Sequence, residues 1–148
     1  MPPPERSVLR RMPQGPLIPR RRILLIDGEI DDRQLYGQGL HELGFTVRLC
    51  SSYEEGARCV EEEEHDLVIV DQGSPAFEGR LVLERSVARN RTVPVLVITR
   101  FHDMACYVEA MQLGAVDYLE KPIPLADLLW VIETHLPSNF ALDAEMAS

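Results

Sequence analysis

The chain has 148 residues, of which 45% are hydrophobic and 26% charged, a balance typical of one soluble globular domain. Its formal net charge is −9, although residues 1–22 carry six arginines and one glutamate. A body this acidic should not bind nucleic acid, and no apolar run is long enough to span a membrane. Three cysteines without metal-type spacing argue against disulfides and zinc, so we expect a cytoplasmic protein.

Composition divides the chain into three segments. Residues 1–21 are rich in proline and arginine and predict a disordered basic leader. Residues 22–137 carry the pattern of a globular domain, and residues 138–148 predict a short C-terminal tail. We therefore expect no second, output domain.

From Ile23 onward the predicted elements alternate between strands and helices. Short apolar runs predict strands at 23–27, 46–50, 66–71, 94–99 and 115–120. Segments of helical period follow them at 33–43, 53–64, 79–90, 102–113 and 125–136. Three of the strands are almost wholly apolar, which is typical of strands buried on both faces of a parallel sheet. Strand then helix, five times, predicts a doubly wound α/β fold.

Local signals mark several helix ends. Asp31 or Asp32 is the predicted N-cap of the first helix, and Gly44 is its predicted end. Ser52 and Glu55 have the spacing of a capping box at the start of the second helix. Trp130, in the last helix, is expected in the core.

Polar residues follow the strands at the edge where an open α/β sheet forms its functional crevice. They are Asp27-Gly28-Glu29, Asp71, Thr99-Arg100 and Lys121. Each alone has an ordinary explanation, such as the start of a helix or a turn. Because all of them fall at one edge of one sheet, the pattern favours a functional pocket.

On these residues, the segment from about 22 to 137 resembles a two-component response-regulator receiver domain. The resemblance is carried by Asp27 and Glu29, Asp71 in VIVDQGSP, Thr99 in VLVIT, Tyr118 in VDYLEKP, and the pair Lys121-Pro122. It implies a flavodoxin-like, five-stranded parallel sheet of strand order 2-1-3-4-5 with helices on both faces. It also implies a phosphoprotein of bacterial phosphorelay signalling with no enzymatic turnover of its own.

The resemblance implies a chemical role for each pocket residue. Asp71 would accept a phosphoryl group from a sensor histidine kinase or a phosphotransfer protein, forming an aspartyl phosphate. Mg²⁺ would be held by Asp27, Asp71 and the backbone carbonyl of Gly73. Lys121 and Thr99 would contact the phosphoryl oxygens.

The same resemblance implies a conformational switch. Thr99 would move inward toward the new charge, and Tyr118 would follow into the vacated space. The Lys121-Pro122 peptide is expected to be cis. The face formed by the helix at 102–113, the strand at 115–120 and the helix at 125–136 would then bind a downstream protein or form a homodimer.

Two residues depart from the family pattern. Gly28 stands where the family carries a second aspartate, and this loss should weaken Mg²⁺ binding. Glu29, one residue further on, is an alternative ligand. Arg100 stands where a small residue is usual, so it could obstruct the phosphodonor, replace the missing cation over Asp71 or Asp27, or point into solvent.

Three functions remain open from the sequence. The first is a receiver that accepts a phosphoryl group on Asp71. The second is a pseudo-receiver, a protein-interaction module that works without phosphorylation, and Gly28 and Arg100 favour it. The third is a small phosphatase or a nucleotide- or flavin-binding enzyme, which the absence of a phosphate-binding glycine motif or a Cys or Ser nucleophile motif disfavours.

Overall fold

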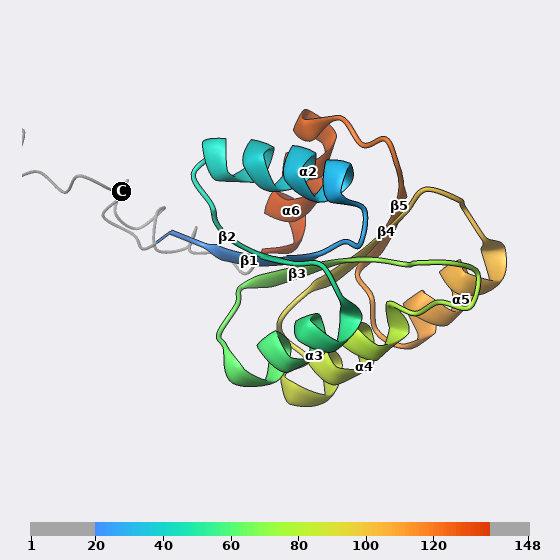
Figure 1. The fold of residues 1–148 in the computed structure, drawn as a ribbon. Helices are drawn as coiled ribbons and strands as arrows, with labels where there is room; N and C mark the ends of the chain where they lie inside the picture. The colour runs from blue at the N-terminus through green and yellow to red at the C-terminus, as the bar shows by residue number, and fades with distance from the viewer. Residues whose placement is uncertain (1–19, 137–148) are drawn as a thin grey trace, which may run out of the picture.

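A computed structural model describes residues 20–136, in which five strands alternate with five helices (Figure 1). The strands are β1 (Arg22–Ile26), β2 (Thr46–Cys50), β3 (Leu67–Asp71), β4 (Val95–Thr99) and β5 (Asp117–Glu120). The helices are α2 (Ile30–Glu42), α3 (Tyr53–Glu62), α4 (Arg80–Arg89), α5 (Met104–Gln112) and α6 (Leu125–His135). None of the helices described is long and apolar enough to cross a membrane. The predicted tail at 138–148 and all but the last two residues of the predicted leader lie outside the described residues.

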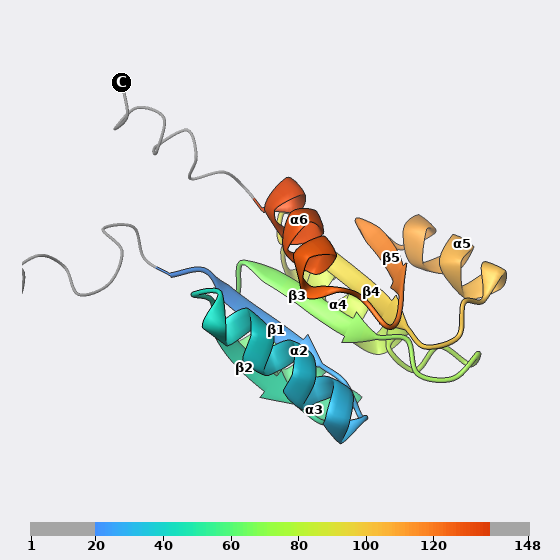
Figure 2. The same cartoon turned by 90° about the horizontal axis from the view of Figure 1, so that it is seen from above.

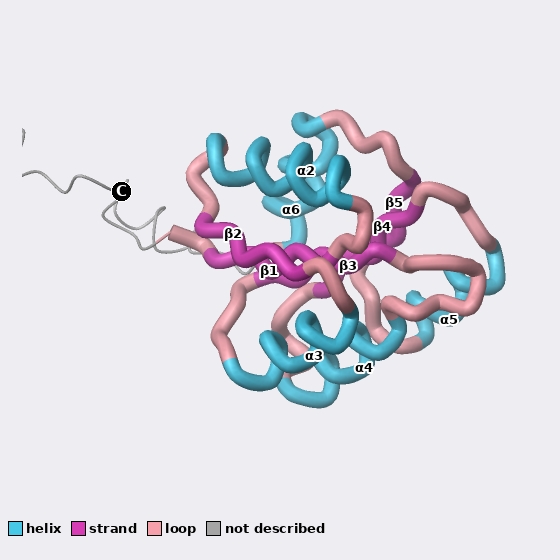
Figure 3. The backbone as a smooth tube through the Cα atoms, viewed as in Figure 1, coloured by secondary structure: helices cyan, strands magenta, loops and turns pink. Residues whose placement is uncertain are grey.

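The sheet is parallel throughout and has the order β2-β1-β3-β4-β5, which confirms the predicted fold. Seen from above, the five strands run in the same direction (Figure 2). The register pairs Asp71 with Ile98 and Thr99 with Glu120. The loops that leave β1, β3 and β4 therefore emerge at the same edge of the sheet (Figure 3).

Helices cover both faces of the sheet, so the molecule has two apolar cores. Helices α2 and α6 lie over one face, and α3, α4 and α5 lie over the other (Figure 1). Strand β1 serves both cores, because Ile23 and Leu25 pack toward α2 and α6 while Leu24 and Ile26 pack toward the opposite layer. All four are fully buried, and each such side chain contributes about 1.5–3 kcal/mol to folding. This burial fixes where β1 ends and where Asp27 emerges.

Two of the predicted helix ends are confirmed, and one is wrong. The hydroxyl of Ser52 accepts a hydrogen bond from the Glu55 N–H at 3.1 Å, as predicted, and Gly44 ends α2 with φ of +103°. The predicted cap of α2 is wrong, because the helix begins three residues early and its N-cap is Glu29. Asp31 and Asp32 therefore lie in the first helical turn.

The expectation that Trp130 is buried is also wrong. The residue is 68% exposed, whereas its neighbours Val131 and Ile132 are buried. The sequence of α6 has apolar residues all round the helix, so its periodicity does not show which side faces the sheet.

Candidate functional site

One buried lysine connects three carboxylates at the carboxyl edge of the sheet. The Nζ atom of Lys121 lies 2.7 Å from Asp27 Oδ2, 2.9 Å from Asp32 Oδ2 and 2.9 Å from Asp71 Oδ1. The side chain of Lys121 is 1% exposed and that of Asp27 is 0% exposed. Three negative groups thus face a single ammonium group in a pocket largely closed to water.

The sheet topology brings these side chains together. Asp27 directly follows β1, Asp71 is the last residue of β3, and Lys121 directly follows β5. Asp32 joins them from the first turn of α2. The Lys121-Pro122 peptide is cis, as predicted. Of the predicted site residues, the structure thus brings Asp27, Asp71 and Lys121 into direct contact.

The pocket changes the proton affinity of its members. Burial alone would lower the pKa of Lys121, but hydrogen bonds to the three carboxylates raise it above its ordinary value. Burial raises the pKa of Asp27, and the nearby charge of Asp71 acts in the same direction. Burial also opposes ionisation of Asp32, yet hydrogen bonds from Lys121 and Arg100 hold its pKa below the ordinary value. Lys121 and Asp32 are therefore charged at neutral pH.

Asp71 is held by contacts to both carboxylate oxygens. Its Oδ1 pairs with Lys121, while its Oδ2 accepts hydrogen bonds from the Gly73 N–H at 2.9 Å and the Tyr53 hydroxyl at 3.3 Å. Gly79, at the start of α4, packs so closely that a Cβ atom there would clash with the backbone carbonyl of Asp71. The Asp71 side chain keeps 13% of its surface exposed, so it remains accessible from solvent.

The two predicted switch residues are buried and have other partners in this state. The hydroxyl of Thr99 donates to the Phe101 carbonyl at 2.8 Å and accepts from the Phe101 N–H at 3.1 Å. The hydroxyl of Tyr118 donates to Gln72 Oε1 and accepts from the Asp103 N–H at 3.3 Å. Tyr118 is 7% exposed, so its ring already lies inside the protein.

The two atypical positions lie beside the pocket. A Cβ atom at Gly28 would meet only the Ser51 carbonyl oxygen, at 3.8 Å, so the backbone leaves room for a side chain. Glu29 is exposed at the N-cap of α2. The guanidinium of Arg100 forms an ion pair with Asp32, and its side chain is 46% exposed. Arg100 thus contacts an acid of the pocket, though neither of the aspartates predicted to hold Mg²⁺.

Comparison with known proteins agrees with this geometry. The model of the family described as response regulator receiver domain matches residues 23–133. The chain belongs to this family. Receiver domains are the signalling modules of two-component systems, and this receiver has relatives among bacterial transcriptional regulators.

The relatives show how far the similarity extends. The receiver is 32% identical over 123 residues to the transcriptional regulatory protein ZraR of Escherichia coli, covering 83% of this chain and 28% of ZraR. It is 35% identical over 108 residues to the transcriptional activator protein IrlR of Burkholderia pseudomallei, covering 73% of this chain and 47% of IrlR. The chain thus spans less than half the length of these regulators.

Solved structures agree on the fold. A CheY-like receiver domain protein of Methanospirillum hungatei superposes with a TM-score of 0.74 at 26% identity, covering 78% of this chain and 93% of that one. A receiver domain protein of Clostridium thermocellum gives a TM-score of 0.71 at 31% identity, with the same coverage.

Three contacts in and beside this receiver's pocket were not predicted from the sequence. Asp32 was one of two predicted N-cap residues, whereas it contacts Lys121 inside the pocket. Tyr53 donates to Asp71 from the start of α3, and Gln72, which directly follows β3, accepts a hydrogen bond from Tyr118. The sequence held one signal for the role of Asp32. It is an acidic residue only five positions after Asp27, at a strand end where Gly28 replaces the carboxylate that the family pattern has.

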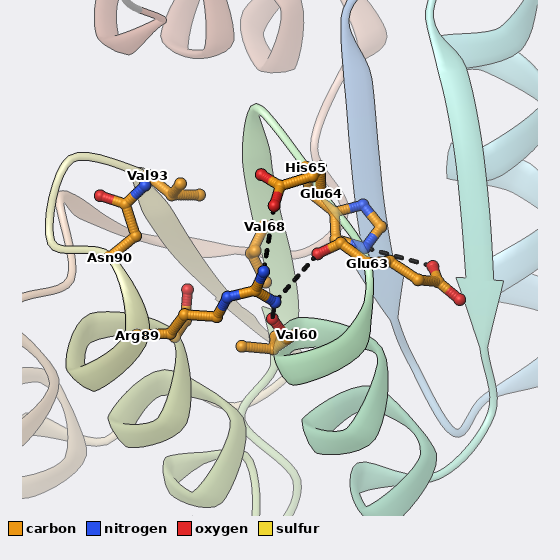
Figure 4. Close-up of a pocket in the computed structure, with 9 residues that line it drawn as sticks. Val60, Glu63, Glu64, His65, Val68, Arg89, Asn90 and Val93 are labelled. Carbon is orange, nitrogen blue, oxygen red and sulfur yellow. Dashed lines mark hydrogen bonds and ion pairs between the residues drawn. The ribbon is translucent and has the colours of Figure 1, made fainter.

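A small cavity lies away from this pocket, between the ends of α3 and α4 (Figure 4). Its volume of about 30 Å³ suits a water molecule rather than a substrate. Arg89 crosses it and donates to the backbone carbonyls of Val60 and Glu63. His65 lines it with a side chain only 6% exposed, and its Nε2 lies 3.3 Å from Glu63 Oε1, an ion pair if the imidazole is protonated. Within residues 20–136 neither ring nitrogen makes a hydrogen bond of good geometry. Burial lowers the pKa of His65.

Proposed function

We propose that Asp71 is the phosphoacceptor of this receiver and takes a phosphoryl group from a phosphohistidine of a sensor kinase or phosphotransfer protein. The observation that carries the proposal is the contact of Asp71 Oδ1 with the buried ammonium of Lys121, at 2.9 Å. Asp27 is fully buried and Asp32 is shared by two cations, whereas Asp71 is partly exposed and has one cationic partner. Asp71 is therefore the carboxylate that a bulky donor can best reach.

In the proposed reaction, an Asp71 oxygen attacks the phosphorus while the bond from phosphorus to the donor nitrogen breaks. The donor imidazole leaves with the electron pair of that bond. Lys121 stays charged because of its three carboxylates, so it can neutralise charge on the phosphoryl oxygens. Tyr53 and the Gly73 N–H hold Asp71 Oδ2 and so orient the carboxylate.

The donor set of the pocket also fits Mg²⁺. Mg²⁺ is commonly bound by one or two carboxylates and keeps several waters, and the side chains of Asp27 and Asp71 with the Gly73 carbonyl provide such a set. When bound, Mg²⁺ would neutralise charge on the transferring phosphoryl group. Over residues 20–136 no three His, Cys, Asp or Glu side chains are arranged around a common metal position. The three aspartates instead converge on Lys121.

The proposed output is a change in the face formed by α5, β5 and α6. Tyr118 on β5 is hydrogen-bonded to Gln72, the residue next to Asp71. A movement of the backbone at Asp71 would therefore reach Tyr118, and with it this face, through the side chain of Gln72. The face and the loop before it expose several apolar side chains, namely Phe101, Met104, Tyr107, Val108 and Met111. Such a surface suits a downstream protein or a second copy of the chain.

A second candidate function is that of an interaction module that does not use phosphorylation. Gly28 removes a carboxylate from the cation site, and the ion pair between Arg100 and Asp32 already balances part of the charge of the pocket. In this alternative a partner protein alone sets the conformation of the α5–β5–α6 face.

Intact mass distinguishes the two functions. The chain is incubated with acetyl phosphate, with and without Mg²⁺, beside Asp71→Asn. Our proposal predicts a gain of one phosphoryl group in the wild type and none in the variant. An unmodified wild type at high Mg²⁺, and after exposure to a phosphorylated kinase domain, would establish the interaction module instead.

A further inference from the structure

Two cationic side chains converge on one oxygen atom of the pocket. Asp32 Oδ2 accepts a hydrogen bond from Lys121 Nζ at 2.9 Å and another from the guanidinium of Arg100. Lysine and arginine side chains bind phosphate oxygens by the same charge-assisted hydrogen bonds that they make to carboxylates. In this state, therefore, a carboxylate of the protein fills an anion site between the two cations.

The position of this anion site connects it to the acceptor. Lys121 contacts Asp32 and Asp71 with the same Nζ atom, so Arg100 is separated from Asp71 by one carboxylate and one ammonium group. Arg100 directly follows Thr99 at the end of β4, and about half of its side chain is exposed. It thus lies at the rim of the pocket, and its flexible side chain can reach inward.

We propose that Arg100 is a phosphoryl-binding residue, positioned beside Lys121 by Asp32, whose carboxylate occupies the anion site until a phosphoryl group replaces it. This inference rests on the proposed function, in which Asp71 is the phosphoacceptor. Asp32 is then a positioning residue and also an internal competitor of the phosphoryl group. Asp32 lies in the first turn of α2 and not in the sheet.

The reaction with acetyl phosphate illustrates the step. An Asp71 oxygen forms a bond to phosphorus, the bond from phosphorus to the acetyl oxygen breaks, and acetate leaves as an anion. The phosphoryl oxygens then accept hydrogen bonds from Lys121 and Arg100 in place of Asp32. No proton needs to move, because both cations are charged throughout.

In this exchange, Arg100 compensates for the carboxylate that is absent at Gly28. Gly28 leaves the pocket with one carboxylate fewer for a divalent cation, and the space at that position is open. A guanidinium supplies positive charge without a metal, and its planar donor groups match phosphoryl oxygens. The pocket should therefore retain phosphoryl transfer when Mg²⁺ is scarce.

The test is the initial rate of phosphorylation by acetyl phosphate, measured by intact mass in EDTA and in excess Mg²⁺. Arg100→Ala should lower the rate in EDTA about tenfold or more and lower the rate in Mg²⁺ less. Arg100→Lys should retain part of the rate in EDTA, because it keeps the charge but loses the donor fork. Arg91→Ala, at an exposed position outside the pocket, is the matched control and should leave both rates unchanged.

A double-variant comparison tests the role of Asp32. Asp32→Asn should raise the rate in EDTA, because the competing charge is gone, and Arg100→Ala should still lower the rate in that background. If the double variant and Asp32→Asn have the same rate in EDTA, Arg100 acts only through Asp32 and does not bind the phosphoryl group. If the wild type and Arg100→Ala gain a phosphoryl group at the same rate in EDTA, Arg100 does not bind the phosphoryl group, although Asp71 is still the phosphoacceptor. A wild type that gains none in either condition contradicts the proposed function as well.

Discussion

Restoring a carboxylate by Gly28→Asp should tighten Mg²⁺ binding strongly. The site tolerates the change, because a Cβ atom there meets only the Ser51 carbonyl oxygen at 3.8 Å and the glycine is not in the left-handed region. Position 28 is exposed, so a carboxylate there, about 5 Å from a divalent cation and at an effective dielectric constant of about 60, attracts the cation by about 2 kcal/mol. An energy of about 2 kcal/mol corresponds to roughly thirtyfold in affinity.

The same side chain should weaken the fold when Mg²⁺ is absent. It adds a fourth carboxylate to a pocket that holds Asp27, Asp32 and Asp71 against Lys121 and Arg100. Like charges about 6 Å apart at that dielectric constant repel by about 1 kcal/mol per pair, and Lys121 offsets part of this. We expect a net loss of about 1 kcal/mol in the free energy of unfolding.

Urea denaturation with and without 10 mM Mg²⁺ measures both effects. If the wild type binds with a Kd of about 10 mM, then about 10 mM Mg²⁺ stabilises it by about 0.4 kcal/mol, and a thirtyfold tighter site gives about 2 kcal/mol. Gly28→Asn, which has the same shape without the charge, should behave as the wild type. Equal stabilisation of the aspartate and asparagine variants by Mg²⁺ would refute the assignment of this pocket as the cation site.

Three further changes test other parts of the account. Lys121→Met leaves three pocket carboxylates without their shared cation and should cost about 3–5 kcal/mol in the free energy of unfolding. Arg48→Met removes only surface ion pairs and should cost less than about 1 kcal/mol. Urea denaturation at pH 7 compares the two variants, and equal losses of stability would show that the buried lysine contributes no more than a surface arginine. Burial depresses the pKa of His65, so at pH values below the ordinary pKa of 6.5 the unfolded chain binds more protons than the folded one. The free energy of unfolding should therefore fall, by up to about 1.4 kcal/mol per pH unit, as the pH drops from 6.5 to the pKa of the folded state. His65→Gln should remove this part of the slope, and unchanged slopes would show that the imidazole is not held neutral. Gly79→Ala places a methyl group against the Asp71 carbonyl and should lower the free energy of unfolding by about 1–3 kcal/mol. Gly28→Ala, in open space, should leave thermal denaturation nearly unchanged. If Gly79→Ala is also neutral, α4 can move away from Asp71.

Much of the fold was predictable because its signals are local. The apolar run of β3 and the Ser52 cap of α3 each depend on a few neighbouring residues, and both were predicted correctly. The contact of Asp27, Asp71 and Lys121 was also predictable, since parallel strands bring their carboxyl ends to one edge of the sheet.

The remaining features depend on rotation about a helix axis. Asp32 faces Lys121 only because α2 begins at Ile30, and a start three residues later would turn it elsewhere. Helix starts are the least certain part of any pattern, so this contact could not be predicted. The exposure of Trp130 has the same origin, because a helix that is apolar all round can pack on more than one side.

Whether Asp71 accepts a phosphoryl group can be measured by transfer from a kinase domain that carries a radiolabelled phosphohistidine. We expect label on the wild-type chain that is lost in alkali, as an acyl phosphate is, and that maps to the peptide containing Asp71. Asp71→Asn should stay unlabelled under the same conditions. Label on another residue, or a wild type that stays unlabelled while a known receiver is labelled by the same kinase domain, would contradict the claim.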